Sequence, residues 1–180
     1  NTTNYAGVQG FYSHFVHVTP YDSSQVLAAG VDIWRSTNGG RTLTRVSFWN
    51  NWFFGDVPPG GPEGPANYSH ADHHTVIFDP QRPDTLYFGN DGGVFRSFDN
   101  GLTFARVNGG YQSTQFYNGF SSAILDPNLA IGGMQDNATA IYHGVVGWRR
   151  VIGGDGCWTA MHPLNLSIMY GEYQNLNIQR

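Results

Sequence analysis

The sequence predicts an all-β fold, a β-propeller of four-stranded antiparallel blades, of which the chain holds about three blades and part of a fourth. Two observations support this prediction. A turn of the form S-x-D-x-G-x-T-F stands at Ser97–Phe104, and a degenerate copy stands at Ser36–Leu43. A longer pattern of strand, proline turn and further strands recurs four times along the 180 residues. Such a repeat indicates a fold assembled from one supersecondary unit, and consecutive antiparallel strands form the blade of a propeller.

The four copies lie near residues 15–46, 75–107, 120–151 and 158–180, and a long insertion at 47–74 separates the first two. In each copy the first strand ends at a proline turn, because proline cannot donate to a strand ladder. Two more short strands follow, and in the first two copies the S-x-D-x-G-x-T-F turn leads into a fourth. The third copy lacks this turn but keeps the strand that starts at Trp148, and the fourth stops at Arg180, where the turn would begin. We therefore expect the remaining blades to come from a longer parent chain or from other subunits; a β-sandwich with coincidentally similar turns is the alternative.

Each position of the turn has a physical role. A short Asp or Asn side chain accepts hydrogen bonds from the backbone N–H groups ahead of it, and glycine supplies a conformation that β-branched residues avoid. The Thr hydroxyl can bond back into the loop, and the aromatic residue begins the next strand and can pack on a neighbouring sheet. The structural positions are Ser97, Asp99, Gly101, Thr103 and Phe104 in the second copy, and Ser36, Asn38, Gly40 and Thr42 in the first.

The composition excludes several classes of function. Charged residues make up 12% of the chain and the net charge is -4, so there is no electrostatic case for nucleic acid or an anionic membrane as partner. All the basic residues are arginine, which rules out lysine chemistry. The single cysteine, Cys157, excludes an internal disulfide, and we expect it to be buried and inert. No apolar run approaches the ~20 residues of a membrane-spanning helix.

Mild signals place the protein outside the cell. N-x-S/T sequons, the acceptors of N-glycosylation, occur at Asn1, Asn67, Asn137 and Asn165. The chain begins without methionine and without a signal-peptide pattern, which indicates a processed product or an excerpt of a longer chain. We expect a secreted or cell-surface glycoprotein.

The turns resemble those of a known superfamily, the Asp-box (BNR-repeat) β-propellers. The resemblance rests on Ser97–Phe104, on the weaker Ser36–Leu43 and on the Asp-Pro turns at Asp79 and Asp126. The run Tyr87–Ser97 is similar to blades of xyloglucanase-type glycoside hydrolases and of sortilin-like receptors. The resemblance covers the chain from the first repeat onward and implies a propeller fold, but it does not fix the function, since members of this superfamily differ in what they do.

The same resemblance implies one catalytic residue. Xyloglucanase-type enzymes carry a catalytic carboxylate in a T-D-x-G-G-x-Y-R loop, and the similar run here is Asn90–Arg96, which matches Asp91 to that carboxylate. Asn90 stands where the family has Thr, and one loop residue is missing before Val94. The second catalytic Asp of these enzymes has no assignable match, and neither do the arginine triad and the Tyr nucleophile of sialidases.

Strand alternation predicts that the polar loops gather at one end of the blades. In an antiparallel meander, the loop between strands two and three lies at the same end as the connection to the next blade, opposite the Asp-box turn. We therefore expect convergence of the candidate catalytic carboxylates Asp91, Asp136 and Asp155 with the candidate ligand-binding residues Asn90, Gln135 and Asn137. Asp, Asn and Gly are also ordinary turn formers, so a purely structural role is the alternative.

His70, Asp72 and His74 precede the first strand of the second copy, and all three point one way if the segment is extended. His and Asp together suit Zn²⁺ or another first-row metal, so a divalent metal site is one interpretation. The same residues could bind a ligand through hydrogen bonds or act as an acid–base pair. A hydrogen-bonded rim that merely orders the loop is the third interpretation.

The insertion at 47–74 begins with an aromatic stretch and continues as a Pro/Gly-rich loop, which can be neither a helix nor an inner strand. Exposed aromatic rings beside carboxylates suit a sugar, because apolar sugar faces stack on flat rings. Trp49 and Trp52 are therefore candidate ligand-binding residues, and 111–117 forms a second aromatic stretch. Packing between blades is the alternative for these rings.

Three functional hypotheses follow. The first is an extracellular propeller segment that binds carbohydrate or another extracellular polymer on its Asp-rich end. The second is a glycoside hydrolase, xyloglucanase-like or sialidase-like, that uses paired carboxylates. The third is a structural or receptor-like propeller whose rim contacts protein in a cell-surface assembly.

Overall fold

The computed structural model describes residues 2–109 and 114–180, and the chain divides into two compact units. Unit 1 comprises Asn1–Trp52 and Pro62–Gly109, and unit 2 comprises Phe53–Gly61 and Gly110–Arg180. The insertion between the first two repeats is therefore shared by the two units.

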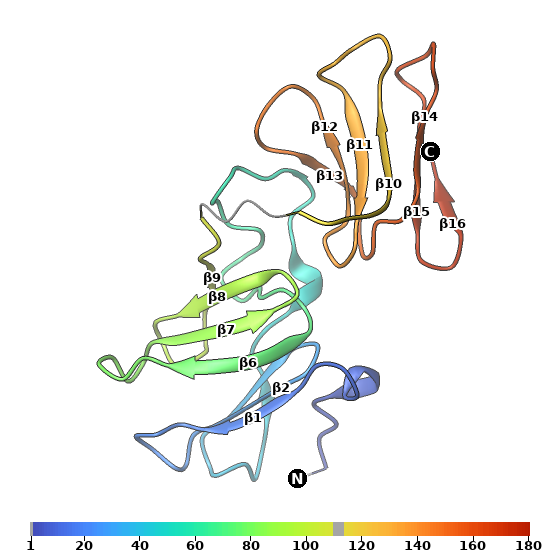
Figure 1. The fold of residues 1–180 in the computed structure, drawn as a ribbon. Coiled ribbons are helices and arrows are strands. Elements are labelled where there is room, and N and C mark those ends of the chain that lie inside the picture. Colours follow the sequence, from blue (N-terminus) through green and yellow to red (C-terminus); the bar gives the residue numbers. More distant parts are fainter. Residues whose placement is uncertain (1, 110–113) are drawn as a thin grey trace. The chain divides into compact units, whose positions relative to one another are not determined.

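Unit 1 consists of two antiparallel meanders, each with four strands in chain order (Figure 1). The first is formed by β1 (Phe15–Val18), β2 (Val26–Ala29), β3 (Ile33–Ser36) and β4 (Thr44–Arg45). The second is formed by β6 (His73–Phe78), β7 (Leu86–Asn90), β8 (Gly93–Ser97) and β9 (Ala105–Arg106). Two short 3-10 helices, η1 (Gly7–Gln9) and η2 (Trp49–Asn51), stand outside the sheets.

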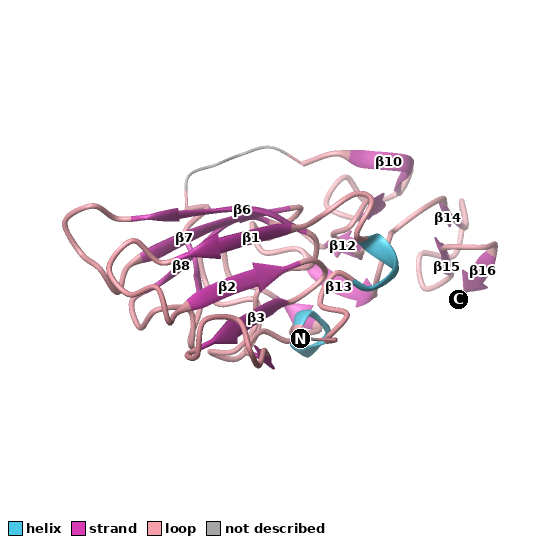
Figure 2. Ribbon diagram, turned by 90° about the horizontal axis from the view of Figure 1, so that it is seen from below, coloured by secondary structure: helices cyan, strands magenta, loops and turns pink. Residues whose placement is uncertain are grey.

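The two sheets of unit 1 enclose one hydrophobic core, with β1 against β6 (Figure 2). Leu27 and Ile33 from the first sheet and Leu86, Phe88 and Phe95 from the second are almost completely buried in it. Period-2 burial is clear in β7, where Leu86, Phe88 and Asn90 are buried and the intervening residues are half-buried. This alternation is typical of a strand that turns one face to a core.

The two Asp-box-like turns have closely similar hydrogen bonds. In the second, Asp99 Oδ1 accepts from Ser97 Oγ (2.7 Å) and from the backbone N of Thr103 (2.8 Å), and Thr103 Oγ1 donates to Asp99 Oδ2 (2.6 Å). In the first, Asn38 Oδ1 accepts from Ser36 Oγ and from the backbone N of Thr42, both at 2.9 Å. Gly40 and Gly101 have φ angles of 81° and 83°, as the sequence predicts for this position.

Replacing Asp99 with alanine should lower the free energy of unfolding by about 1–3 kcal/mol, because the Ser and Thr donors lose their common acceptor. Asp99→Asn should cost clearly less, since Asn38 already fills this role in the first turn. Burial alone would raise the pKa of Asp99, but the hydrogen bonds from Thr103, Ser97 and Leu102 outweigh it and lower the pKa. The ionised Asp99 side chain thus adds to the free energy of unfolding at neutral pH, and this stabilisation is lost as the pH falls below the ordinary pKa of Asp. Thermal melts of the three proteins at pH 7 and pH 3 check this; equal Ala and Asn melts at pH 7 would contradict it.

Unit 2 contains a five-stranded and a three-stranded sheet. The larger has the order β10 (Phe116–Ser122), β11 (Ala130–Met134), β12 (Thr139–Tyr142), β13 (Arg149–Ile152) and β5 (Gly55–Asp56). The smaller consists of β14 (Thr159–Met161), β15 (Met169–Tyr173) and β16 (Asn177–Gln179). The outer strand β5 comes from the Pro/Gly-rich insertion, and its pairing with β13 was not predicted from the sequence.

Glycines let the two sheets of unit 2 approach closely. A Cβ at Gly133 would lie 2.1 Å from the carbonyl oxygen of Cys157, and one at Gly119 would lie 2.3 Å from the same oxygen. Both glycines are therefore required by backbone contact between the third and fourth repeats. A Cβ at Gly132 would meet the ring of Phe116. This ring centroid lies 5.6 Å from that of Trp148.

The predicted fold class is confirmed: the chain is all-β and is built of antiparallel meanders of the propeller-blade type. All four repeats appear as sheets, and the fourth has three strands, as its truncated pattern predicts. None of the helices in the described part of the chain is long and apolar enough to span a membrane.

Candidate functional site

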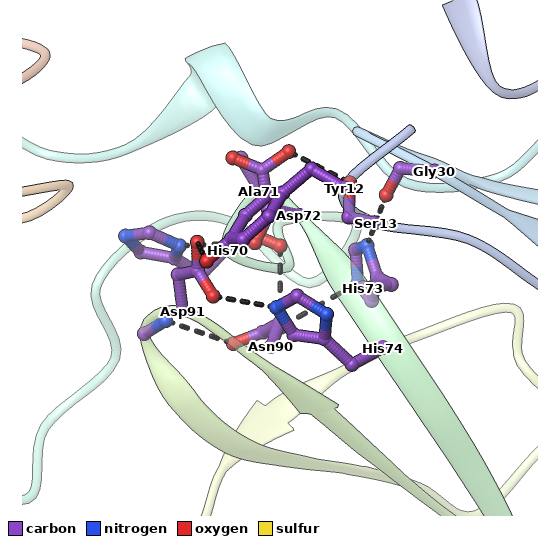
Figure 3. A network of polar contacts seen from close by, with 11 residues as sticks. Tyr12, Ser13, Gly30, His70, Ala71, Asp72, His73, His74, Asn90 and Asp91 are labelled. Atoms are coloured by element: carbon purple, nitrogen blue, oxygen red, sulfur yellow. Dashed lines mark hydrogen bonds and ion pairs between the residues drawn. The ribbon is translucent and has the colours of Figure 1, made fainter. Parts of the chain in front are cut away.

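A cluster of polar side chains lies at one end of the meanders of unit 1 (Figure 3). It is formed by the turn before β1, by the segment that enters β6 and by the loop between β7 and β8. The Asp-box-like turns lie at the other ends of the strands, since they follow β3 and β8. Within unit 1, the predicted segregation of polar loops and Asp-box turns is therefore present.

Asp91 in the β7–β8 loop is held from two sides. His74 Nε2 lies 2.7 Å from Asp91 Oδ1, and Tyr12 donates its hydroxyl proton to Asp91 Oδ2 over 3.1 Å. The rings of Tyr12 and His74 meet edge to face, with centroids 5.1 Å apart. The orientation of the Asp91 carboxylate is thus fixed, and each of its oxygens keeps a further lone pair for a ligand.

Asp72 is the second carboxylate of this cluster. One of its oxygens lies within 4.8 Å of a carboxylate oxygen of Asp91, and Ser13 Oγ donates to Asp72 Oδ1 over 3.0 Å. Burial raises the pKa of Asp72 above its ordinary value, and the negative charge of Asp91 adds to this effect. The backbone of Asp72 has a φ of 60°, a left-handed conformation that Asp tolerates better than most residues.

Buried polar groups next to Asp72 and Asp91 in the sequence form a hydrogen-bonded network of their own. His73 is fully buried between Gly30 O (3.2 Å from Nδ1) and Ser69 Oγ (3.0 Å from Nε2). Burial lowers the pKa of His73 to about 3, so this imidazole is neutral at physiological pH. Asn90, a predicted ligand-binding residue, is buried here and donates to Ser69 Oγ and to His70 O, both at 3.2 Å.

The segment that carries His70, Asp72 and His74 is not extended. The left-handed turn at Asp72 and the irregular pairing at the start of β6 change the alternation. His74 faces Asp91, whereas His70 is buried with its ring against Gly92, where a Cβ would lie 2.4 Å from the ring. The extended geometry assumed from the sequence is therefore absent, although Asp72 and His74 both lie beside Asp91. Metal binding by this trio stays a prediction.

Asp32, in the β2–β3 loop, is near enough to the cluster that the charge of Asp72 acts on it. It is buried and paired with Arg45 (2.7 Å between Arg45 Nη2 and Asp32 Oδ2), and it accepts from Ser47 Oγ and from the backbone N of Trp49. Burial raises the pKa of Asp32 despite these partners. The Trp49 side chain is 41% exposed, whereas Trp52 packs against the hydrophobic core, so that only Trp49 of this predicted pair is well placed to meet a ligand.

The predicted site residues of unit 2 form a second polar group. Asp155 Oδ1 accepts from the backbone N of Asp136 over 2.8 Å, and Asp155 Oδ2 accepts from the side chain of Gln174. Asn137 bonds to the backbone oxygen of Gln135. Asp136 and Asp155 thus lie in one loop cluster of unit 2, where the Asp155 carboxylate orders the β11–β12 loop. The catalytic partnership of Asp91 with Asp136 or Asp155 stays a prediction.

Cys157 is half-buried rather than buried, and burial followed by the charges of Glu172 and Asp155 raises the pKa of its thiol. Among the predicted glycosylation positions, Asn165 is exposed, Asn67 and Asn137 are half-buried, and Asn1 lies outside the described residues. Residues 111–113 of the second aromatic stretch also lie outside them. Glycosylation stays a prediction.

Sequence reasoning missed Tyr12 and Ser13, which precede the first repeat. They lie 79 and 59 residues before Asp91 and Asp72, the residues that they contact. No repeat, motif or spacing in the sequence links such distant positions, and the only available signal was the aromatic-rich run Phe11–Phe15.

Neither a protein-family model nor a curated protein matches the sequence. Among solved structures, a GH74 enzyme of Niastella koreensis is 19% identical over 89% of this chain and 24% of its own, with a TM-score of 0.37. The GH74 xyloglucanase of Xanthomonas campestris is 17% identical over 92% of this chain and 23% of its own, with a TM-score of 0.34. YCF48 bound to D1 peptide is 13% identical over 88% of this chain and 61% of its own, with a TM-score of 0.26. These proteins are propeller folds, and the chain spans about a quarter of the length of the two GH74 enzymes.

Proposed function

We propose that the polar cluster of unit 1 is a carbohydrate-binding site and that the Asp72 and Asp91 carboxylates accept hydrogen bonds from sugar hydroxyl groups. The observation that supports this proposal best is the close pair of carboxylates, with oxygens within 4.8 Å, beside a half-exposed tyrosine. Carboxylates form strong charge-assisted hydrogen bonds with hydroxyl donors. An aromatic ring beside them can pack on the apolar face of a sugar.

The fixed orientation of Asp91 favours a binding role. His74 and Tyr12 hold this side chain before any ligand arrives, so that less conformational entropy is lost on binding. The site belongs to a protein that we propose to be secreted or displayed at the cell surface, where it meets polysaccharide, with its remaining blades supplied by a longer parent chain or by other subunits.

Asp91→Asn should weaken binding to a polysaccharide about ten- to hundredfold, since a hydrogen bond to a charged group contributes about 1.5–3 kcal/mol. Asparagine retains the shape, and its amide can still bond to Tyr12 and His74, so the fold should survive. Affinity electrophoresis in gels that contain β-glucan, xylan or galactan measures the effect, and Asp84→Asn, an exposed carboxylate near the opposite end of the unit, is the matched control. A wild-type protein that migrates in every such gel as in a blank gel would refute the proposal.

Glycoside hydrolysis is the second candidate, and it is favoured by the unequal environments of the two carboxylates. Burial raises the pKa of Asp72, which suits a general acid that protonates the leaving oxygen, while Asp91 is held in place by His74 and Tyr12 as the second carboxylate of the pair. Release of reducing ends from the same polysaccharides, lost in both Asp72→Asn and Asp91→Asn, would distinguish hydrolysis from binding alone.

A further inference from the structure

We propose that the turn Gly10–Ser13 supplies the aromatic platform of the carbohydrate site and that Tyr12 stacks on the pyranose ring whose hydroxyl groups bind Asp72 and Asp91. This inference rests on the proposed function and deepens it, because it names the residue whose ring packs on the sugar. It also differs from the expectation from the sequence, in which Trp49 and Trp52 form the platform.

The position of Tyr12 is fixed by neighbouring contacts. The backbone N–H groups of Tyr12 and Ser13 both donate to Gln9 O, at 2.8 and 3.0 Å, which closes the turn after η1. Ser13 is fully buried and anchors the turn to Asp72. The Tyr12 hydroxyl and ring are then held by Asp91 and His74, as Figure 3 shows.

Exposure distinguishes this turn from the predicted platform. Tyr12 is 52% exposed, so a large aromatic side chain that contacts Asp91 stands at the surface. Trp52 instead packs against the core. Trp49 is exposed, and its backbone N donates to Asp32. A ring that contacts Asp91 directly is better placed to touch a sugar bound there.

The chemistry of the site defines the class of ligand. A flat ring packs on a pyranose that has a continuous apolar face, as β-linked glucose and xylose have because their hydroxyl groups are equatorial. Asp32, Asp72 and Asp91 make the site acidic, and Arg45 is paired with Asp32. Uronic and sialic acids would therefore be repelled, and the expected ligand is a neutral oligosaccharide with an apolar pyranose face.

The test compares Tyr12→Ala with Tyr12→Phe by isothermal titration with cello- and xylo-oligosaccharides. Tyr12→Ala should weaken binding about tenfold, because the sugar loses its packing contact with the aromatic ring. Tyr12→Phe keeps the ring and loses only the hydroxyl bond to Asp91, so its affinity should stay within about threefold of the wild type. Tyr21→Ala is the matched control, because Tyr21 is also half-exposed, at 54%, and donates its hydroxyl to a backbone oxygen, that of Pro80.

Thermal melting separates a ligand contact from a merely structural role. Tyr12→Ala should bind cello- and xylo-oligosaccharides more weakly while its melting temperature stays close to that of the wild type. Wild-type affinity in Tyr12→Ala, together with loss of binding in Asp91→Asn, would overturn the platform and leave the proposed function standing. Absence of any oligosaccharide binding by the wild-type protein would overturn both.

Discussion

Replacing Phe88 with alanine should lower the free energy of unfolding by about 3–5 kcal/mol, the usual cost of removing a buried phenylalanine. Phe88 is fully buried in β7, at the centre of the unit 1 core. Its ring lies 5.5 Å from that of Phe104, 6.3 Å from that of His73 and 6.4 Å from that of Phe15. The cavity would therefore open where both sheets of the unit meet and directly beneath the candidate site.

Phe98→Ala is the matched control for this substitution. Phe98 is 54% exposed and packs beneath the Arg96 guanidinium, which lies 4.2 Å from its ring centroid, so its loss should cost at most about 1 kcal/mol. Denaturant titration gives the two stabilities, and hydrogen exchange measured on peptides shows whether the loss is confined to unit 1. A cost for Phe88→Ala no larger than that for Phe98→Ala would contradict the described core.

The fold could be predicted from the sequence because its signals are local. The Asp-box-like turns are closed by side chains at most four residues from their partners, as in the bonds between Ser97, Asp99 and Thr103. Such contacts depend on the nearest residues alone, so the same short run of residues forms the same turn wherever it recurs. The prolines that end each first strand act locally in the same way.

Contacts between distant segments could not be predicted in this way. The outer strand β5 pairs with β13 about ninety residues later through two register pairs, Arg149 with Asp56 and Arg150 with Gly55, and two-residue strands carry no periodicity. Tyr12 and Ser13 reach Asp91 and Asp72 across similar separations. In each case the partner is chosen by packing of the whole unit, which no window of sequence contains.

The candidate site shows both kinds of signal. The resemblance of the Asn90–Arg96 loop directed attention to Asp91, and the structure places that residue beside His74, another predicted site residue. The extended segment assumed for His70, Asp72 and His74 is absent, because Asp72, directly before β6, is left-handed. A period-2 argument holds only while the backbone stays extended, and here it breaks where the polar residues gather.

Arg106→Met should be the second strongly destabilising substitution, with a cost of about 3–5 kcal/mol, because it leaves a buried carboxylate without its cation. Arg106 Nη1 in β9 lies 2.6 Å from Glu63 Oε1, and the Glu63 side chain is only 4% exposed. Glu63 belongs to the Pro/Gly-rich insertion, so this pair ties the insertion to the second meander of unit 1.

A double-mutant cycle separates the lost ion pair from lost packing. Glu63→Met combined with Arg106→Met removes both charges and keeps much of the apolar volume, so the double mutant should recover most of the stability that Arg106→Met loses. Asp56→Ala is the comparison at an exposed pair: Asp56 lies 3.7 Å from His143, the two side chains are 62% and 38% exposed, and its cost should stay below about 1 kcal/mol. A double mutant less stable than Arg106→Met would show that the Glu63 carboxylate is stabilised by partners other than this arginine, and it would contradict the prediction.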